Sequence, residues 1–313
     1  MKARYISLKP LVDWRRKRRP LDFSDLFSEC RPVVLEIGFG NGEYLGRRAA
    51  VERSKNFVGL EREWQSVWRA LRYIARNELS NVRIIKADAR WAIFRLFGEH
   101  TFSEIYSLFP CPWPKERHKR HRLFSKKFLQ RLNNILEPGG RLWIVTDDGD
   151  YAKWVIEQSQ STGFKVDQSA VPAGTYGTKY ENKWAKAGLK FFCLLTFCKE
   201  YECPNFDVKE YTLQTHRIVH FNPDEFRPIP VRGQIVVDFK DCLFDPQQQR
   251  CLVRAVVVED EFVQDFWIEI RKHEANWHIR PASGCGWIPT LGLQKALDAV
   301  RDSCLRNIPT NRS

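Results

Sequence analysis

The sequence lacks the long apolar runs that mark membrane proteins. No stretch reaches about 18 consecutive apolar residues, and the basic first twenty residues are not followed by a hydrophobic segment. We therefore expect neither a transmembrane helix nor a signal peptide, and we expect a cytoplasmic location. With 313 residues, 43% of them apolar, the chain is long enough for two globular domains with buried cores.

Metal-binding cysteine patterns are also missing. The nine cysteines include no C-x-x-C pair, and most of them stand in apolar runs such as Phe191–Cys198. Such cysteines are typical of reduced, buried thiols. The histidine pairs His216/His220 and His273/His278 lack the cysteine or acidic neighbours of a ligand set, so we expect no metal site.

Acidic residues are scarce in two short segments that carry the excess positive charge. Residues 1–20 contain eight Lys or Arg and one Asp, and residues 115–127 contain seven and one Glu, which accounts for the net charge of +13. Concentrated positive charge favours a polyanion, most often nucleic acid. An anionic membrane fits less well because neither segment has a wide apolar face. From residue 201 onward, 16 acidic residues outnumber 14 basic ones, which gives no sign of a second nucleic-acid surface.

Short apolar or β-branched runs alternate with helical patterns up to about residue 200, which is typical of βα units in a parallel sheet. The predicted strands are 33–37, 56–60, 82–86, 104–109, 141–145 and 190–198, and the predicted helices are 43–50, 64–77, 89–97, 123–136 and 151–161. Later, extended runs at 231–240, 251–258 and 262–271 precede one helix at 291–305. We predict a basic arm over residues 1–20, an α/β domain over 21–203 and a smaller α+β domain over 204–313.

A glycine-rich turn follows the first predicted strand. Gly38, Gly40 and Gly42 are preceded by Glu36 and followed by Glu43. The G-x-G-x-G spacing differs from the G-x-G-x-x-G of a dinucleotide site, and glutamates here would repel a pyrophosphate. A nicotinamide-dependent dehydrogenase therefore fits the α/β pattern but not this turn. S-adenosylmethionine fits better because it carries a sulfonium and an amino group.

Two further acids stand at predicted strand ends. Glu61, 21 residues after Gly40, suits a ribose diol, and Asp88 suits the adenine amine. Either acid alone would be interpreted as a helix cap. Ligands of open α/β sheets bind at the carboxyl ends of the strands, so we expect both acids to share one site with Glu36.

The segment LFPCPWPKERHKRHR, residues 108–122, contains three prolines around a tryptophan and then a run of cations. Pro110, Pro112 and Pro114 stiffen the backbone because proline fixes φ. A solvated basic helix start is the plain alternative, but it needs no prolines. We predict a rigid loop that feeds an anion-binding surface, with Trp113 either in the core or stacked on a nucleobase.

Four blocks of the chain, within about residues 33–198, resemble the bacterial tRNA (guanine-N7-)-methyltransferases of the TrmB family. They are VVLEIGFGNG, LFPCPWPKERHKRHRL, VTDDGDYAKW and TKYE, and the proline–tryptophan block is the most specific. The resemblance implies a Rossmann-like class I methyltransferase fold, with a seven-stranded, mostly parallel sheet whose last strand is antiparallel. It also implies methyl transfer from the cofactor S-adenosylmethionine to guanine N7 of tRNA, the partner, at the variable-loop guanine.

The resemblance further implies roles for individual residues. The implied cofactor contacts are Glu36, Gly38, Gly40, Gly42, Glu61, Asp88 and Cys111. The implied tRNA contacts are Lys115, Asp147, Thr178, Lys179, Tyr180 and Glu181. On its own, the TKYE block would be interpreted as a surface turn before the last strand.

One position departs from the family pattern. The family has an active-site aspartate where this chain has Cys111, and a neutral thiol is a weak hydrogen-bond partner. Guanine N7 is an unprotonated lone pair, so the transfer needs alignment and no general base. Asp147 or Glu181 would stabilise the charge that develops on the purine. We predict an active enzyme with Cys111 and Asp147 at the catalytic positions; the alternative is a tRNA-binding homologue that has lost catalysis.

Two regions outside these blocks have less defined expectations. The arm with the basic run from Trp14 to Arg19 is expected to be disordered without RNA and to add non-specific phosphate contacts. The residues after 203 give no indication of their role, and the oligomeric state stays open.

Overall fold

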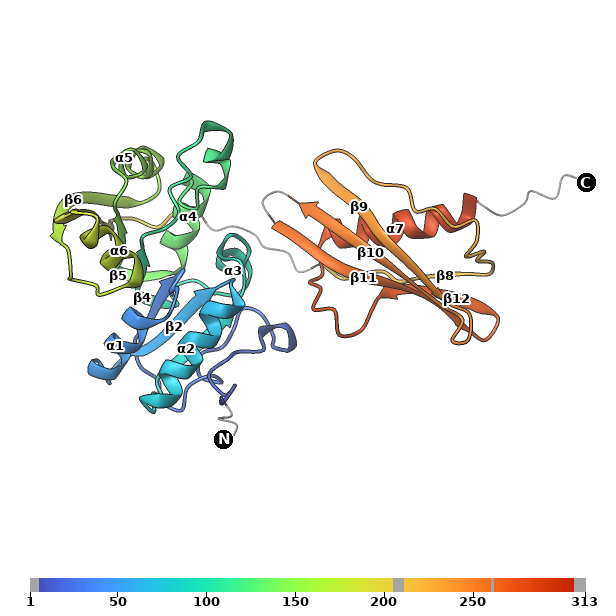
Figure 1. Ribbon diagram of the computed structural model, residues 1–313, viewed down its shortest axis with the longest axis horizontal. Coiled ribbons are helices and arrows are strands. Elements are labelled where there is room, and N and C mark those ends of the chain that lie inside the picture. The colour runs from blue at the N-terminus through green and yellow to red at the C-terminus, as the bar shows by residue number, and fades with distance from the viewer. Residues whose placement is uncertain (1–5, 205–210, 260–261, 307–313) are drawn as a thin grey trace, which may run out of the picture. The chain divides into compact units, whose positions relative to one another are not determined.

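The computed structural model describes residues 6–204, 211–259 and 262–306. The chain forms two compact units, Met1–Asp207 and Val208–Ser313, and each has its own β-sheet (Figure 1). No helix in the described ranges is long and apolar enough to cross a membrane.

The first unit contains a seven-stranded sheet with the order β3-β2-β1-β4-β5-β7-β6. Its strands are β1 (Val33–Ile37), β2 (Asn56–Glu61), β3 (Val82–Lys86), β4 (Phe102–Leu108), β5 (Leu136–Thr146), β6 (Phe164–Pro172) and β7 (Phe191–Lys199). Strand β7 runs antiparallel to both of its neighbours, whereas the pairs among β1 to β5 are parallel. The predicted mostly parallel sheet with an antiparallel last strand is confirmed.

Helices connect these strands and bury apolar faces against the sheet. They are α1 (Glu43–Val51), α2 (Trp64–Arg76), α3 (Ala89–Arg95), α4 (Lys126–Ile135), α5 (Gly149–Gln158) and α6 (Lys179–Lys186). In α2, the buried side chains of Val67, Ala70, Leu71 and Ile74 recur at helical spacing and pack with β1 to β3 in one cluster. Each fully buried leucine there contributes on the order of 1.5–3 kcal/mol.

The structure differs from the predicted elements at several places. Strand β6 and helix α6 were not predicted, and the TKYE block forms the start of α6 rather than a surface turn. Helix α4 begins three residues later than predicted, at Lys126, with Ser125 at its N-cap, and a short 3-10 helix, η2 (Glu116–His121), lies in the basic run before it. Strand β5 begins at Leu136, five residues earlier than the predicted start at 141.

The N-terminal segment is packed onto the first unit, so the expected disorder was wrong for residues 6–20. Trp14 lies in a 3-10 helix, η1 (Trp14–Arg16), is only 3% exposed, and stands 4.9 Å from the ring of Trp91. Its indole Nε1 donates to the carbonyl of Lys86, and the backbone N–H of Val12 donates to Ile84. Apolar side chains among the cations hold the segment in place; residues 1–5 lie outside the described residues.

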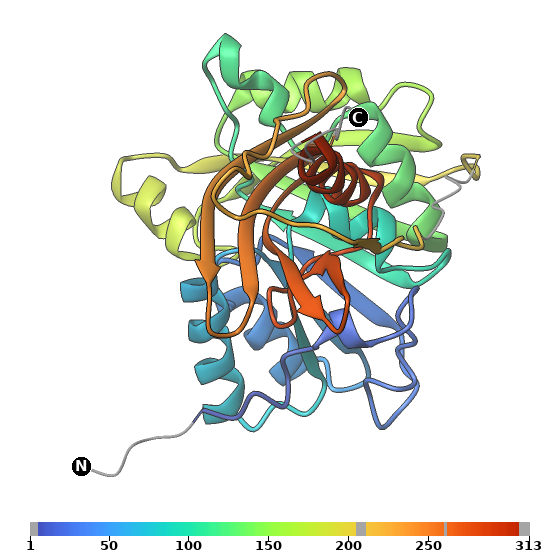
Figure 2. The ribbon, with the colours of Figure 1, turned by 90° about the vertical axis from the view of Figure 1, so that its right-hand side faces the viewer.

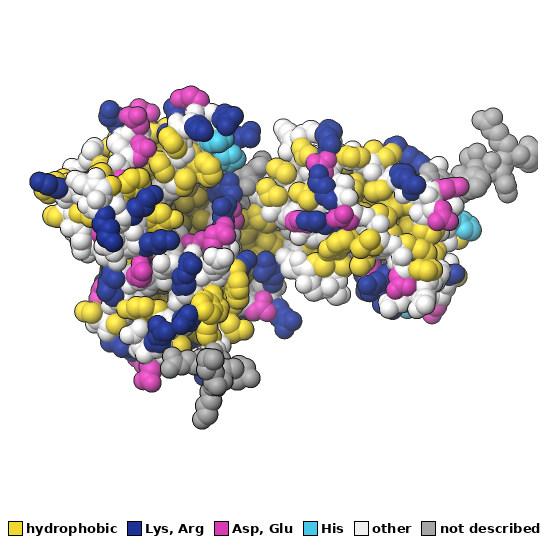
Figure 3. Space-filling view, in the orientation of Figure 1, with side chains coloured by type: hydrophobic (Ala, Val, Ile, Leu, Met, Phe, Trp, Pro, Cys, Tyr) yellow, Lys and Arg dark blue, Asp and Glu magenta, His cyan; other side chains and the backbone are white. Residues whose placement is uncertain are grey.

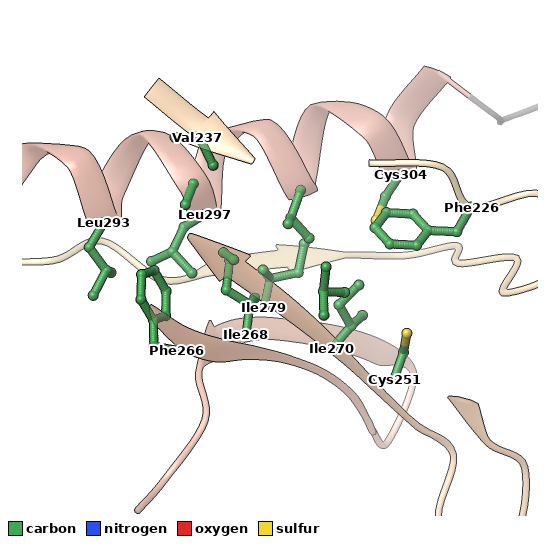
Figure 4. Close-up of a cluster of buried hydrophobic side chains, with 14 of the residues drawn as sticks. Phe226, Val237, Cys251, Phe266, Ile268, Ile270, Ile279, Leu293, Leu297 and Cys304 are labelled. Carbon is green, nitrogen blue, oxygen red and sulfur yellow. The ribbon is translucent and has the colours of Figure 1, made fainter. Parts of the chain in front are cut away.

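The second unit is an antiparallel sheet with one helix, as the predicted α+β class requires. Its strands are β8 (His216–Ile218), β9 (Ile235–Asp245), β10 (Arg250–Glu259), β11 (Phe262–His273) and β12 (Asn276–Pro281), in the order β8-β12-β11-β10-β9. Helix α7 (Leu291–Arg306) lies along one face of this sheet (Figure 2). Its Leu293 and Leu297 pack against Phe266, Ile268 and Ile279 (Figure 4). Alternate side chains of each strand therefore point to the other face.

Candidate functional site

The glycine turn after β1 combines an unusual backbone with open space. Gly38, Gly40 and Gly42 have φ angles of +74°, +56° and +75°, which glycine adopts without strain. A Cβ at Gly38 or Gly40 would meet no atom within 4 Å, whereas one at Gly42 would lie 2.7 Å from Cβ of Ala70 on α2. The first two glycines therefore leave room for a ligand to approach the backbone, and the third packs α1 against α2.

Glu36 is a buried carboxylate at the end of β1. It is 3% exposed, and its Oε2 has no hydrogen-bond partner among the described residues. Burial raises its pKa to about 8, although Arg48 and Arg47 partly oppose the shift. A buried carboxylate oxygen without a partner is costly unless a cation or donor meets it. An amino group is such a donor, so this position fits the methionine end of S-adenosylmethionine.

The two other predicted acids are brought to the same edge of the sheet. Glu61 Oε2 accepts from the backbone N–H of Gly40 at 3.2 Å, and its charge contributes to the raised pKa of Glu36. Asp88 caps α3 by accepting from the N–H of Arg90 at 2.9 Å, and it also pairs with the Arg90 guanidinium at 2.6 Å. The strand ends of β1, β2 and β3 thus present three carboxylates at one edge of the sheet.

The proline-rich loop after β4 has a strained backbone. Phe109 and Trp113 have φ angles of +54° and +45°, which are rare for aromatic residues. Such strain clusters at functional sites and persists only where the surroundings enforce it. Trp113 is only partly buried and stands 5.1 Å from the ring of His121, measured between centroids, so it lies outside the core. Cys111 and Lys115 in the same loop are exposed.

Arg122 ties this loop to α5. Its Nε donates to the carbonyl of Pro112 at 2.8 Å, and its guanidinium lies 5.5 Å and 5.1 Å from the ring centroids of Tyr151 and Trp154. The residue is only 4% exposed. We did not predict this role, because only the fold brings the basic run and α5 together.

Asp147 stands at the carboxyl end of β5, next to the capping residue of α5. Burial raises its pKa, and the neighbouring Asp148 adds to this shift whereas Lys183 of α6 opposes it. Asp148 caps α5 by accepting from the N–H of Tyr151 at 2.8 Å. Asp147 is therefore a partly buried carboxylate with a lysine from α6 in its surroundings.

The TKYE block caps helix α6. Thr178 accepts from the N–H of Glu181 at 3.1 Å, and Glu181 accepts in return from the N–H of Thr178 at 3.3 Å. Glu181 is fully buried and also accepts from the N–H groups of Gly174 and Tyr176. Because three backbone donors occupy its carboxylate, Glu181 holds the loop before α6. Its predicted contact with tRNA stays a prediction.

The starts of α1 and α6 lie side by side. Glu43 accepts from the N–H of Lys179 at 3.1 Å, and Arg47 donates to the carbonyls of Tyr176 and Gly177. An open hollow of about 520 Å³ is found here, lined by Glu43, Lys179, Asn182, Lys183 and Lys186. Three of these side chains are lysines on one helix, which suits an anionic ligand. The lysines at 183 and 186 were missed because α6 itself was not predicted.

Within the described ranges, no group of three or more His, Cys, Asp or Glu side chains could hold a metal ion. What the fold and the site do define is a class I S-adenosylmethionine-dependent methyltransferase. The decisive features are the antiparallel β7, the open glycine turn after β1 and the acids at the ends of the first three strands.

Comparisons with known proteins agree with this class. A family model described as a putative methyltransferase matches residues 30–194. The tRNA (guanine-N(7)-)-methyltransferase of Chlorobium phaeobacteroides is 39% identical over 160 residues, which cover 51% of this chain and 78% of the relative. That of Thermotoga maritima is 38% identical, over 57% of this chain and 58% of the relative. The chain belongs to the tRNA (guanine-N7-)-methyltransferase family.

One relative aligns beyond the four blocks on which the resemblance first rested. The tRNA (guanine-N(7)-)-methyltransferase of Aquifex aeolicus is 25% identical over 297 residues, covering 92% of this chain and 97% of the relative. Most of the second unit therefore aligns with that relative. Among solved structures, the 16S rRNA methyltransferase KamB superposes with a TM-score of 0.46 at 18% identity, over 57% of this chain and 93% of that one.

Proposed function

We propose that this chain transfers a methyl group from S-adenosylmethionine to N7 of a guanine in tRNA, at the variable loop. The observation that carries the proposal is the parallel pairing of β1 with β4. The carboxyl ends of neighbouring parallel strands meet at one edge of the sheet, so the glycine turn and the basic, proline-rich loop leave it side by side. A cofactor site and an anion-binding loop are thereby adjacent. A cytoplasmic location remains our expectation.

S-adenosylmethionine supplies an electrophilic methyl group on a sulfonium, and guanine N7 accepts it without a general base. The chain's own residues would bind and align the two reactants. We assign the amino group to Glu36, the ribose to Glu61 and the adenine amine to Asp88, with the turn at Gly38, Gly40 and Gly42 giving close access to the backbone.

Positive charge moves onto the purine during the transfer, and a nearby carboxylate lowers the energy of that state. We assign this role to Asp147, which is partly buried and therefore acts with less screening by water. Lys115, Thr178, Lys179 and Tyr180 are assigned to the tRNA. Lys115 and Tyr180 are exposed, and Lys179 lines the hollow at α6.

Cys111 is the position at which the proposal is most open to test. The side chain is exposed in a loop whose backbone is held by Arg122, so a thiol fits there without disturbing the fold. The other acids at the edge of the sheet support an intact site. We therefore expect catalysis with Cys111 in place.

The test is methyl transfer from labelled S-adenosylmethionine to unmodified tRNA, followed by nucleoside analysis. Wild type, Cys111→Asp and a control, Cys30→Asp, are compared; Cys30 is another exposed cysteine of the first unit. We expect N7-methylguanosine from all three proteins. Product from Cys111→Asp alone would show that the natural chain is a tRNA-binding homologue without catalysis.

A further inference from the structure

A row of basic residues crosses the sheet of the second unit. The strand registers place Arg217 of β8 opposite His278 of β12, His278 opposite Arg271 of β11, and Arg271 opposite Arg250 of β10. Four basic side chains from four strands thus stand in one line, which we call the cationic row. Neighbouring strands are about 4.8 Å apart, so the row extends over roughly 14 Å.

The cationic row points away from α7. The sequence neighbours Ile218, Ile279, Ile270 and Cys251 are buried in the core that α7 covers. Alternation along each strand therefore directs the row to the opposite face. Arg217 and Arg271 are exposed, and His278 and Arg250 are partly exposed. Figure 3 shows the space-filled surface of this unit, where apolar side chains lie among charges of both signs.

Among the described residues, the charges of the row are compensated only at its Arg250 end, where Asp245 of β9 lies opposite Arg250 in the register. Like charges directly opposite one another destabilise a sheet. Within the described ranges, neither Arg217 nor Arg271 forms an ion pair or a side-chain hydrogen bond. The carboxylate of Glu269 lies 3.8 Å from Arg250 but is shared with Arg280, which approaches to 2.9 Å.

The charge of another arginine on the same face, Arg254, is compensated by two carboxylates. Arg254 pairs with Asp265 at 2.6 Å and with Asp241 at 3.2 Å. Two carboxylates therefore flank Arg254, whereas Arg217 and Arg271 of the row have no acidic partner within the described ranges. The near-neutral composition after residue 201 hides this difference between the arginines, so it could not be predicted from the sequence.

The pKa of His278 responds to the charges around the row. Its pKa is lowered by desolvation first, and then by the positive charges of Arg217, His273 and Arg280, with Glu274 opposing. A polyanion laid along the row would remove the repulsion and raise the pKa of His278. The imidazole is therefore a built-in probe of what the row binds.

We infer that the cationic row binds backbone phosphates of tRNA and so gives the second unit its own contact with the substrate. This inference rests on the function proposed above. Arginine suits phosphate because its planar guanidinium donates two parallel hydrogen bonds. A line of basic groups over about 14 Å matches a polyanion better than a single small anion, which would engage only one or two of them.

The experiment compares two double variants in the full chain. Arg217→Gln with Arg271→Gln removes two charges from the row. Lys295→Gln with Arg301→Gln removes the same charge from α7, on the other face of the sheet. The dissociation constant of unmodified tRNA is measured from about 50 to 200 mM salt, together with kcat and KM for methyl transfer.

We expect the row variant to bind tRNA several-fold more weakly at low salt. Its slope of log affinity against log salt should be shallower by about one to two. The reason is that fewer counterions are released on binding when phosphate contacts are lost. KM for tRNA should rise while kcat at saturating tRNA stays unchanged, and the control variant should match wild type. In wild type, added tRNA should raise the pKa of His278 in an NMR titration.

The inference would be overturned by equal salt slopes for wild type and the row variant, or by equal weakening of tRNA binding in both double variants. Loss of binding to phosphatidylserine vesicles with unchanged tRNA binding would also overturn it and assign the row to a membrane. A wild type that binds tRNA through the row but forms no N7-methylguanosine would leave the inference standing and contradict only the proposed function.

Discussion

Glu36 shows how far a ligand site can be predicted from the position of a single residue in the sequence. Its place directly before a glycine turn at a strand end was enough to predict a ligand contact, and the same reasoning selected Glu61 and Asp88. The role of Arg122 was not predictable in this way, because its hydrogen bond to Pro112 and its packing on Tyr151 and Trp154 depend on how α5 folds back. The position of an acid along the chain is local information, whereas the support of a strained loop is not.

The raised pKa of Glu36 makes a prediction about stability. The carboxyl has a pKa of about 8 in the folded chain and about 4.5 when unfolded, so the folded state binds the proton more tightly. Ionisation of Glu36 therefore does not lower the stability below about pH 4.5, and it lowers the stability increasingly as the pH rises towards 8. Glu36→Gln removes this cost, which is on the order of a few kcal/mol.

We expect Glu36→Gln to raise the melting temperature at pH 8 to 9 and to leave it nearly unchanged near pH 4. Thermal unfolding at both pH values measures this, with Glu157→Gln on exposed α5 surface as the control. The same substitution should weaken binding of S-adenosylmethionine, measured by calorimetry. An equal melting temperature for wild type and Glu36→Gln at high pH would show that the buried carboxylate carries no such cost.

At the scale of elements, strands were predicted better than short helices. The apolar runs that became β1 to β4 were recognisable because both faces of a parallel sheet are buried. Helix α6 was missed because its eight residues have only one buried side chain, Glu181. Its start is fixed by hydrogen bonds to the loop before it and to Glu43 of α1, which no periodicity reveals.

The cap of α6 can be tested directly. Thr178→Ala removes the side-chain oxygen that accepts from the N–H of Glu181, which should cost about 1 kcal/mol of stability. Thr178→Ser keeps the oxygen and should cost much less. We also expect Thr178→Ala to raise KM for tRNA, because the lysines of the hollow stand on this helix. Denaturant unfolding and steady-state kinetics check both effects; equal stability of the Ala and Ser variants would contradict the role of the cap.

At the scale of the whole molecule, the net charge could be predicted from the sequence, but the positions of the charged surfaces only in part. The two basic segments were visible as runs in the sequence, whereas the cationic row is assembled from residues on four separate strands. The N-terminal segment shows the opposite error. Its composition suggested disorder, yet Val12 and Trp14 are buried and anchor it to the first unit.

This anchoring changes how the N-terminal charge has to be tested. Deleting residues 1–19 would uncover the surface on which Trp14 packs, so a loss of tRNA binding would mix charge with stability. Arg16→Gln with Arg18→Gln removes two exposed charges and keeps the anchor. We expect a shallower dependence of log affinity on log salt with an unchanged melting temperature.

Trp14→Ala is the matched opposite. It keeps every arginine but removes a buried indole, which should destabilise the chain by about 3–5 kcal/mol. If the segment contacts RNA, the arginine variant should change the salt dependence of tRNA binding and keep the melting temperature. Trp14→Ala should lower the melting temperature. An unchanged slope in the arginine variant would mean that the segment serves the fold alone, because a phosphate contact cannot lose two charges without releasing fewer counterions.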